Sequence, residues 1–215
     1  VALAEPGSAK VLTLDQDVTG TLAIAAEAKP EQFDTVARNP DDLAALLYTS
    51  GTTGRSKGAM LTHGNLVSNT QSLVTAWEMS ADDVLVHALP IFHTHGLFVA
   101  LNAALMVGMR VNFMPGFDAE KILAALPRAT LMMGVPTFYT RLLADERFGK
   151  DVAANMRLFI SGSAPLLAET HEAFTARTGH HILERYGMTD TNMNTSNPYH
   201  GARIPGSVGL PLDGV

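Results

Sequence analysis

The densest group of anion-binding residue types in this chain is the segment Tyr48 to Gly58, which reads YTSGTTGRSKG. Glycines let backbone N–H groups approach an anion closely, hydroxyl side chains add donors, and Lys57 adds a positive charge. Together these residue types predict a cradle for a polyphosphate. A solvated turn is the alternative, because Gly, Ser and Thr are ordinary turn residues. The polyphosphate interpretation is favoured because a plain turn does not need so many donors beside a lysine.

Two familiar catalytic patterns do not match. A P-loop needs G-x-x-x-x-G-K-[ST], but the fifth residue after Gly51 is Ser56, and Lys57 is followed by Gly58. A zinc-binding H-E-x-x-H motif is excluded as well, because His171-Glu172 is followed by Thr175 where the second histidine would stand.

Three further segments carry residues suited to binding. PIFHTHGLF (90–98) holds two histidines, and with no third ligand nearby a substrate contact or a packed imidazole is favoured over a metal pair. ISGSAPL (160–166) is built of small residues that leave room for a flat ring, although a tight turn between a strand and a helix explains it too. ERYGMTD (184–190) places an arginine, a tyrosine and an aspartate close together.

Short apolar runs alternate along the chain with helical patterns of about 10 to 15 residues. This alternation predicts an α/β fold, with a mainly parallel sheet flanked by helices. The expected strands lie at 11–14, 43–48 (buried), 58–61, 84–89, 110–114, 131–133, 158–161 and 181–184. The expected helices lie at 23–28, 62–77, 97–107, 118–126, 136–143 and 166–177.

The composition limits the classes of function. The chain has 215 residues, of which 47% are hydrophobic and 17% charged, so it can form a core and is not of the disordered class. Its net charge of -6 argues against nucleic-acid binding. Zero cysteines exclude a disulfide scaffold, a thiolate nucleophile and a Cys-ligated metal. The most apolar stretch, 96–109, is shorter than the ~20 residues of a membrane span and predicts a buried helix.

YTSGTTGRSKGAMLTH (48–63) closely resembles the signature loop of the adenylate-forming enzymes, which include acyl-CoA synthetases, luciferases and peptide-synthetase adenylation domains. The three other segments resemble further motifs of that family, in the same order. The chain departs from the family at Ser56, where proline is usual, and at Asp190, where glutamate is usual. The resemblance runs from about Leu43 to the end. It implies that 1–42 leads in from a preceding subdomain and that 43–215 is the ATP- and acyl-binding core, without the C-terminal domain.

The resemblance also implies roles for individual residues. The catalytic residues would be Lys57 and Thr189, with Thr189 touching the α-phosphate. Substrate would contact His93, His95, Ser161, Gly162, Arg185 and Met188. Mg²⁺ would be held by Thr52 and Asp190, since a carboxylate is a suitable hard ligand. ATP or AMP would contact Thr49, Ser50, Gly51, Thr52, Thr53, Gly54, Lys57, Ser163, Ala164, Pro165, Glu184, Arg185, Tyr186 (stacked on adenine), Gly187, Met188 and Thr189.

Arg185 indicates the substrate class. Relatives that activate fatty or aromatic acids usually have a small or neutral residue there, whereas a guanidinium in an acyl pocket would grip a carboxylate and reject an apolar tail. The segments around 93 and 185 are most similar to those of malonyl-CoA synthetases, which implies malonate or methylmalonate, ATP and CoA as substrates. A surface salt bridge from Arg185 to Glu184 or Asp190 is the competing explanation.

Two other functions stay open at this stage. One is an adenylate-former for another acid or for a carrier-protein acceptor, and the other is a nucleotide-binding fragment without turnover. The first residues, VALAEPGSAK, do not form a signal peptide, and both ends suggest a piece of a longer protein. A cytoplasmic location is expected, or the mitochondrial matrix if a transit peptide lies upstream.

Overall fold

The structure is a computed structural model that describes residues 12–15, 17, 19–49 and 57–215. The chain divides into two compact units, Val1–Arg38 and Asn39–Val215. In the first unit the expected helix is present as α1 (Thr21–Glu27). The strand expected at 11–14 is wrong for its described residues, which lie in coil. The backbone N–H of Thr13 donates to the Thr21 hydroxyl and the Thr21 N–H donates to the Thr13 hydroxyl, so this segment ties itself to the start of α1 instead.

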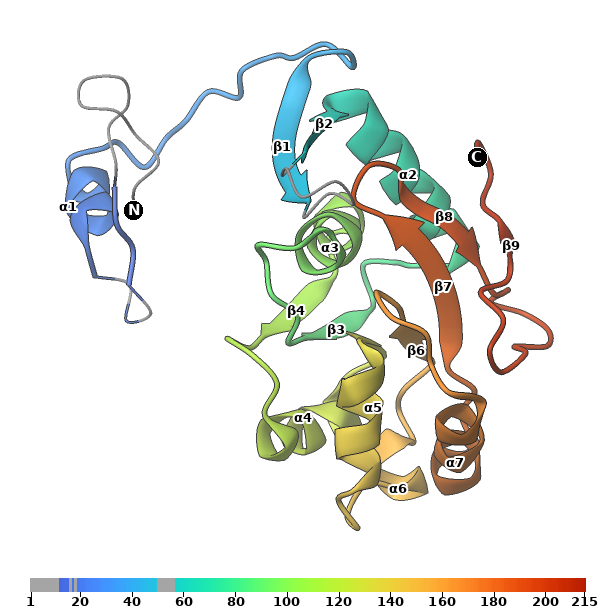
Figure 1. Cartoon of the computed structure of the whole chain (residues 1–215). Coiled ribbons are helices and arrows are strands. Elements are labelled where there is room, and N and C mark those ends of the chain that lie inside the picture. Colours follow the sequence, from blue (N-terminus) through green and yellow to red (C-terminus); the bar gives the residue numbers. More distant parts are fainter. Residues whose placement is uncertain (1–11, 16, 18, 50–56) are drawn as a thin grey trace. The chain divides into compact units, whose positions relative to one another are not determined.

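The second unit is built on a seven-stranded sheet with the order β4-β3-β5-β6-β7-β8-β9 (Figure 1). The first five strands run parallel, and β8 and β9 are antiparallel to their neighbours. The predicted mainly parallel α/β fold is therefore confirmed. The strands are β3 (Val84–His87), β4 (Arg110–Phe113), β5 (Leu131–Gly134), β6 (Leu158–Ser161), β7 (Leu183–Met188), β8 (Asn192–Ser196) and β9 (Leu210–Pro211).

Helices provide the crossovers between the parallel strands, as parallel pairing requires. The carboxyl ends of β3, β5, β6 and β7 consequently lie at one edge of the sheet. The loops at that edge carry the histidine and small-residue segments noted in the sequence, and the arginine segment lies in β7 itself. The helices of the second unit are α2 (His63–Ala76), η1 (His95–Leu101), α3 (Asn102–Val107), α4 (Ala119–Ala125), η2 (Leu126–Arg128), α5 (Pro136–Leu143), α6 (Lys150–Ala153) and α7 (Ala168–Thr178).

The strand expected to be buried at 43–48 is present as β1 (Leu43–Thr49), but its burial is wrong. It pairs antiparallel with β2 (Lys57–Thr62) in a separate two-stranded sheet. Its side chains stay largely exposed, with Tyr48 at 74%. Only Ala59 and Leu61 of β2 are buried. An apolar run predicts a strand but does not say how many layers cover it, which explains the error.

The helix expected at 97–107 forms in two parts, the π-helix η1 and then α3. A Cβ on Gly96 would lie 2.3 Å from the carbonyl oxygen of Pro90, so the chain passes itself too closely there for any side chain. π-Helical turns are frequent at functional sites. Here the wider turn begins at His95, one of the residues predicted to contact substrate.

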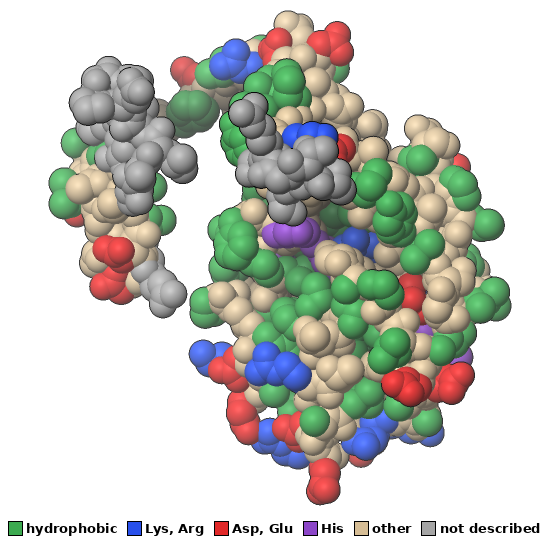
Figure 2. Space-filling model, in the orientation of Figure 1, with side chains coloured by type: hydrophobic (Ala, Val, Ile, Leu, Met, Phe, Trp, Pro, Cys, Tyr) green, Lys and Arg blue, Asp and Glu red, His purple; other side chains and the backbone are tan. Residues whose placement is uncertain are grey.

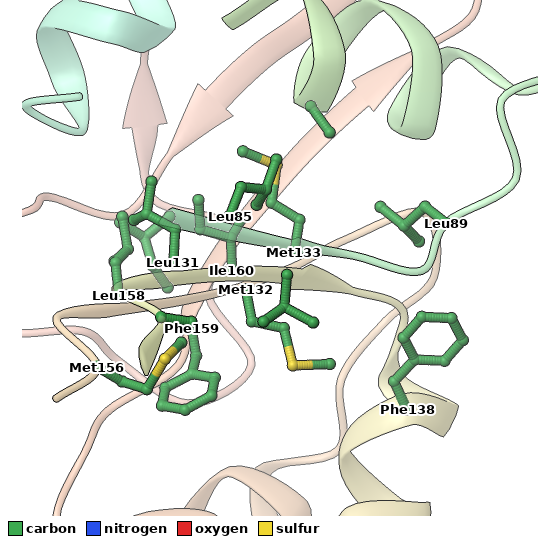
Figure 3. Packing of buried hydrophobic residues seen from close by; sticks show 14 of the residues in the cluster. Leu85, Leu89, Leu131, Met132, Met133, Phe138, Met156, Leu158, Phe159 and Ile160 are labelled. Atoms are coloured by element: carbon green, nitrogen blue, oxygen red, sulfur yellow. The ribbon is translucent and has the colours of Figure 1, made fainter. Parts of the chain in front are cut away.

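The expected strand at 181–184 is shifted and extended, because β7 runs through Met188 and turns back into β8. Aliphatic and aromatic side chains from β3, β5 and β6 form the core, with Leu85 on one face of the sheet and Met132 and Phe159 on the other (Figure 3). Phe159 meets Phe174 of α7 edge-on at 5.0 Å between ring centroids. These contacts hold the strands rigidly in register below the loops that carry the motifs.

The amino ends of the same strands are joined by an ion pair between a buried carboxylate and a partly buried arginine. Asp83, which precedes β3, is 4% exposed in its side chain and accepts bonds from Arg157 Nη2 at 2.6 Å and Nε at 2.7 Å. Thr130 Oγ1 donates to the same carboxylate at 2.7 Å and accepts from the Val84 N–H at 2.9 Å. Burial raises the pKa of Asp83, but the bonds from Arg157, Thr130 and Ser80 outweigh it, so the pKa lies below its ordinary value.

Asp83→Ala should destabilise the protein by about 3–5 kcal/mol at neutral pH, because it leaves the Arg157 charge without its partner. The folded-state pKa is depressed, so this stabilisation is present above the unfolded pKa of about 3.9 and is lost as the pH falls through the folded value. Urea unfolding of the full-length protein across that range measures the difference. Asp82→Ala, at the exposed neighbour, is the control. An equal loss in both variants, or a gap that does not close in acid, contradicts the assignment.

Candidate active site

The loop after β3 brings a histidine into the interior. His93 is exposed, whereas His95 is 2% exposed at the first position of η1. Burial, and next the positive charge of Arg185, hold the pKa of His95 well below its ordinary value, with smaller contributions from His93 and His87. The ring of His95 is therefore neutral at physiological pH.

The loop after β6 meets His95 from the other side. Ser163 has a φ of 68°, in the left-handed region that residues other than glycine rarely occupy. In this conformation its Oγ lies 3.2 Å from His95 Nδ1. The segment 161–164 thus adds a polar contact to His95 to its turn between β6 and α7.

Arg185 of β7 completes the group. It is 3% exposed, and a Cβ on Gly162 would lie 2.3 Å from its Cζ, so the guanidinium lies directly against the Gly162 backbone. Burial, opposed by Tyr139, lowers the pKa of Arg185 to about 10, which leaves it a cation at neutral pH. The surface salt bridge is wrong as an explanation, because Arg185 is buried and pairs with no acid among the described residues.

Most of the buried polar atoms without a hydrogen-bond partner in the described part of the chain gather at this edge of the sheet. They are His87 Nδ1 and Nε2, Thr94 Oγ1, His95 Nε2, Ser161 Oγ, and Arg185 Nε and Nη2. Buried polar groups are nearly always bonded, so such a concentration indicates a place prepared for a ligand or ordered water. On the face shown in Figure 2, a histidine and a basic side chain adjoin amid mostly hydrophobic and uncharged surface.

Two cavities share this edge. The larger, of about 400 Å³, is lined by Ser161, Ser163, Ala164 and Pro165 and by residues 184–187. The smaller, of about 130 Å³, is lined by His93, His95, Ser163, Arg185 and residues 187–189. Ser163, Arg185 and Gly187 belong to both. The structure thus brings together most of the predicted residues from the 90–98, 160–166 and 184–190 segments.

Glu184 holds one wall of the large cavity in place through hydrogen bonds. Its carboxylate oxygen Oε1 accepts from His171 Nδ1 and from the Gly206 N–H, both at 3.1 Å. Gly206 and Val208 line the cavity from a loop that returns to the sheet through β9. Glu184 was predicted to contact the nucleotide, and its carboxylate also ties that loop to α7.

The other predicted residues lie elsewhere. Thr49 and Lys57 are paired at the end of the β1–β2 hairpin, and Ser50, Gly51, Thr52, Thr53 and Gly54 lie outside the described residues. Asp190 is exposed in a separate hollow with Asn192 and Asp213. The carboxylates and the unpartnered Oδ1 of Asn192 make this hollow rich in oxygen, a donor set that suits a hard cation such as Mg²⁺.

Sequence reasoning missed several residues of the site. Thr94 and Met193 line the small cavity, Gly206 and Val208 line the large one, and His171 supports Glu184. Thr94 lies between His93 and His95, which were both predicted to contact substrate, so its position in the sequence could have identified it as a site residue. Met193 lies in β8, Gly206 and Val208 lie in the segment 199–209 that leads to β9, and His171 lies in α7. No local sequence pattern connects these segments to the site.

Comparisons with known proteins identify the class. The model of the family described as AMP-binding enzyme matches residues 2–215, and the chain belongs to this family. The crystal structure of ATP-bound MatB from Rhodopseudomonas palustris superposes with a TM-score of 0.92 at 61% identity, covering 96% of this chain and 41% of that one. A malonyl-CoA ligase complex with methylmalonyl-CoA and AMP superposes with a TM-score of 0.80 at 40% identity, covering 84% and 40%.

Two sequence relatives agree with these structures. The malonate–CoA ligase ACSF3 of Mus musculus, named as mitochondrial, is 43% identical over 188 residues, which is 80% of this chain and 32% of that protein. The malonate–CoA ligase of Arabidopsis thaliana is 39% identical over 205 residues, covering 86% and 34%. The chain therefore spans about a third of the length of these relatives.

Glu184→Ala should weaken AMP binding to the complete enzyme about tenfold or more, because it removes two hydrogen bonds that a charged acceptor makes to α7 and to the cavity wall. Calorimetric titration with AMP measures the change in Kd. Glu172→Ala is the matched control, since Glu172 is exposed on α7 next to His171. Unchanged affinity in the Glu184 variant would remove this carboxylate from the nucleotide site.

Proposed function

We propose that this chain is the ATP- and acid-binding part of an AMP-forming malonate–CoA ligase. In the first step a carboxylate oxygen of malonate attacks the α-phosphate of ATP, and the bond to pyrophosphate breaks. In the second step the CoA thiol takes the malonyl group, and AMP leaves. Methylmalonate fits the same scheme, since one methyl group is worth only ~1–3 kcal/mol in a pocket.

The observation that carries the proposal is the buried cation of Arg185, which pairs with no acid among the described residues. A buried charge without a partner is costly, and an anionic ligand at Nε and Nη2 would relieve that cost. A dicarboxylate leaves one carboxylate free for this contact while the other reacts. A monocarboxylic acid would instead place an apolar tail against the guanidinium, which the site would reject. The similarity to several malonate–CoA ligases supports the same substrate.

The larger cavity suits the adenine of ATP, because its volume lies within the usual range of small-molecule sites. Tyr186, half exposed at its mouth, offers a flat ring for stacking. We assign the smaller cavity to the acid. Since both cavities include Ser163 and Arg185, the acid would lie beside the nucleotide, as attack on the α-phosphate requires.

Catalysis in this scheme is mainly electrostatic. ATP and malonate bring several negative charges together, and Lys57 with the donors of residues 49–56 would neutralise part of that charge while Thr189 bonds the α-phosphate. Asp190, with Thr52, would hold Mg²⁺. When bound, that ion supplies further positive charge to the triphosphate.

The organisation of the whole protein is part of the proposal. Residues 43–215 would form the ATP- and acyl-binding core, with 1–42 leading in from a preceding subdomain. The partners would be malonate, ATP and CoA, with no nucleic acid. None of the described helices is long and apolar enough to cross a membrane. A cytoplasmic location is proposed, with the mitochondrial matrix as the alternative.

The function is tested on the complete enzyme by ATP–pyrophosphate exchange with malonate, methylmalonate, acetate, butyrate and ferulate, followed by transfer to CoA or to a carrier protein. Exchange should be fastest with malonate or methylmalonate, and CoA should be the acceptor. Faster exchange with a monocarboxylic acid would overturn the substrate, and transfer only to a carrier protein would overturn the acceptor.

Arg185→Ala should lower kcat/KM for malonate by about two to three orders of magnitude, because truncating one partner of a buried charge pair costs about 2–5 kcal/mol. It should lower kcat/KM for butyrate far less, so the preference for malonate disappears. Steady-state kinetics with both acids measure the ratio.

Two further variants make this result specific. Gly162→Ala keeps the charge, but its Cβ would displace the guanidinium, so it should also reduce the malonate preference. Arg128→Ala removes an exposed arginine from η2 and should leave the preference unchanged. A preserved preference in Arg185→Ala would show that this arginine does not bind the acid.

A further inference from the structure

The strained backbone of Ser163 needs a physical reason. Positive φ at a serine is unfavourable, and such strain persists only where the surroundings require it. Glycine would occupy this position without cost. The contact that distinguishes serine is the one between its Oγ and His95 Nδ1, at 3.2 Å.

The second nitrogen of His95 points to the purpose of that contact. His95 Nε2 is buried and has no hydrogen-bond partner in the described ranges. His95 lines the small cavity together with Arg185, whose Nε and Nη2 also have no partner among the described residues. A neutral imidazole carries one proton, so the role of Nδ1 decides whether Nε2 is a donor or an acceptor.

Ser163 can serve either tautomer, because its hydroxyl both donates and accepts. Without an anion, the charge of Arg185 favours a lone pair on Nε2. With an anion beside Arg185, a proton on Nε2 is favoured, and the serine hydroxyl rotates to donate to Nδ1. Burial and the nearby charges of Arg185, His93 and His87 disfavour the doubly protonated ring.

We propose that Ser163 is a positioning residue that holds His95 as its Nε2–H tautomer when the dicarboxylate is bound, so that His95 and Arg185 together bond the carboxylate that does not react. This inference rests on the proposed function. It adds a neutral donor beside the cation, and it explains why a serine is kept in a conformation that glycine would adopt more easily.

The direct test is the protonation state of His95 in the complete enzyme. Histidine labelled with ¹⁵N is observed by long-range ¹H–¹⁵N correlation with and without saturating malonate, and the His95→Gln spectrum assigns the signal. The expected result is a proton on Nε2 alone in the malonate complex. A proton on Nδ1, or on both nitrogens, overturns the proposal. The His95→Asn spectrum provides the same assignment if His95→Gln fails to fold.

A pair of variants gives a second readout. The Gln amide can reach the position of Nε2, whereas the shorter Asn amide reaches only that of Nδ1. His95→Gln should therefore keep the ratio of kcat/KM for malonate over butyrate within about threefold, and His95→Asn should lower it about 10- to 100-fold, the effect of one hydrogen bond to a charged group. Ser163→Gly relieves the strain but should lower the same ratio about tenfold.

The outcomes separate this inference from the proposed function. If the wild-type enzyme does not prefer malonate to butyrate, the proposed function fails. If it prefers malonate and Ser163→Gly and His95→Asn both keep that preference, only the roles of Ser163 and His95 fail. Equal losses in His95→Gln and His95→Asn likewise overturn the tautomer assignment, because a donor at the Nε2 position would then have no value.

Discussion

The site is organised around a positive charge that is buried without a counter-charge in the part of the chain that the structure describes. The guanidinium of Arg185 lies against the backbone of Gly162, where any side chain would displace it. The nearest carboxylate in sequence, Glu184, bonds His171 and the Gly206 N–H instead. His95 shares the cavity as a neutral ring, since burial and the same cation keep it unprotonated. A site built in this way is completed by an anion.

The amino and carboxyl ends of the parallel strands differ in how their buried polar groups are hydrogen-bonded. At the amino ends of β3, β5 and β6, Asp83, Thr130 and Arg157 satisfy one another in a closed buried network. At the carboxyl ends, buried polar atoms lack partners. In open α/β sheets ligands bind outside the carboxyl ends of the strands. The carboxyl ends, where buried polar atoms of the described residues lack partners, are therefore the functional side of the sheet. The bonded network at the amino ends contributes stability, which offsets the cost of leaving those polar atoms without partners.

Most errors in the expected elements concern the burial or the packing of a segment rather than whether it forms a helix or a strand. The run at 43–48 does form a strand, but it pairs in a two-stranded sheet and stays exposed. The helix expected at 97–107 exists, but the close approach of Gly96 to Pro90 accompanies a π-helical first part. The hairpin of β7 and β8 was missed because a short polar strand such as NMNTS lacks the apolar pattern of a buried strand.

The sequence alone determined the α/β class, the order of the motifs and the residue types available for binding, because these depend on local pattern and chemistry. It identified His95 and Arg185 as candidates for the acid and the small residues at 161–164 as neighbours of a ligand. Only the tertiary structure decided that Arg185 is buried rather than paired at the surface, and that Ser163 bonds His95. It also brought His171, Met193 and Gly206 to the site. Burial and partnership arise from contacts between segments far apart in the chain, and no local spacing encodes them.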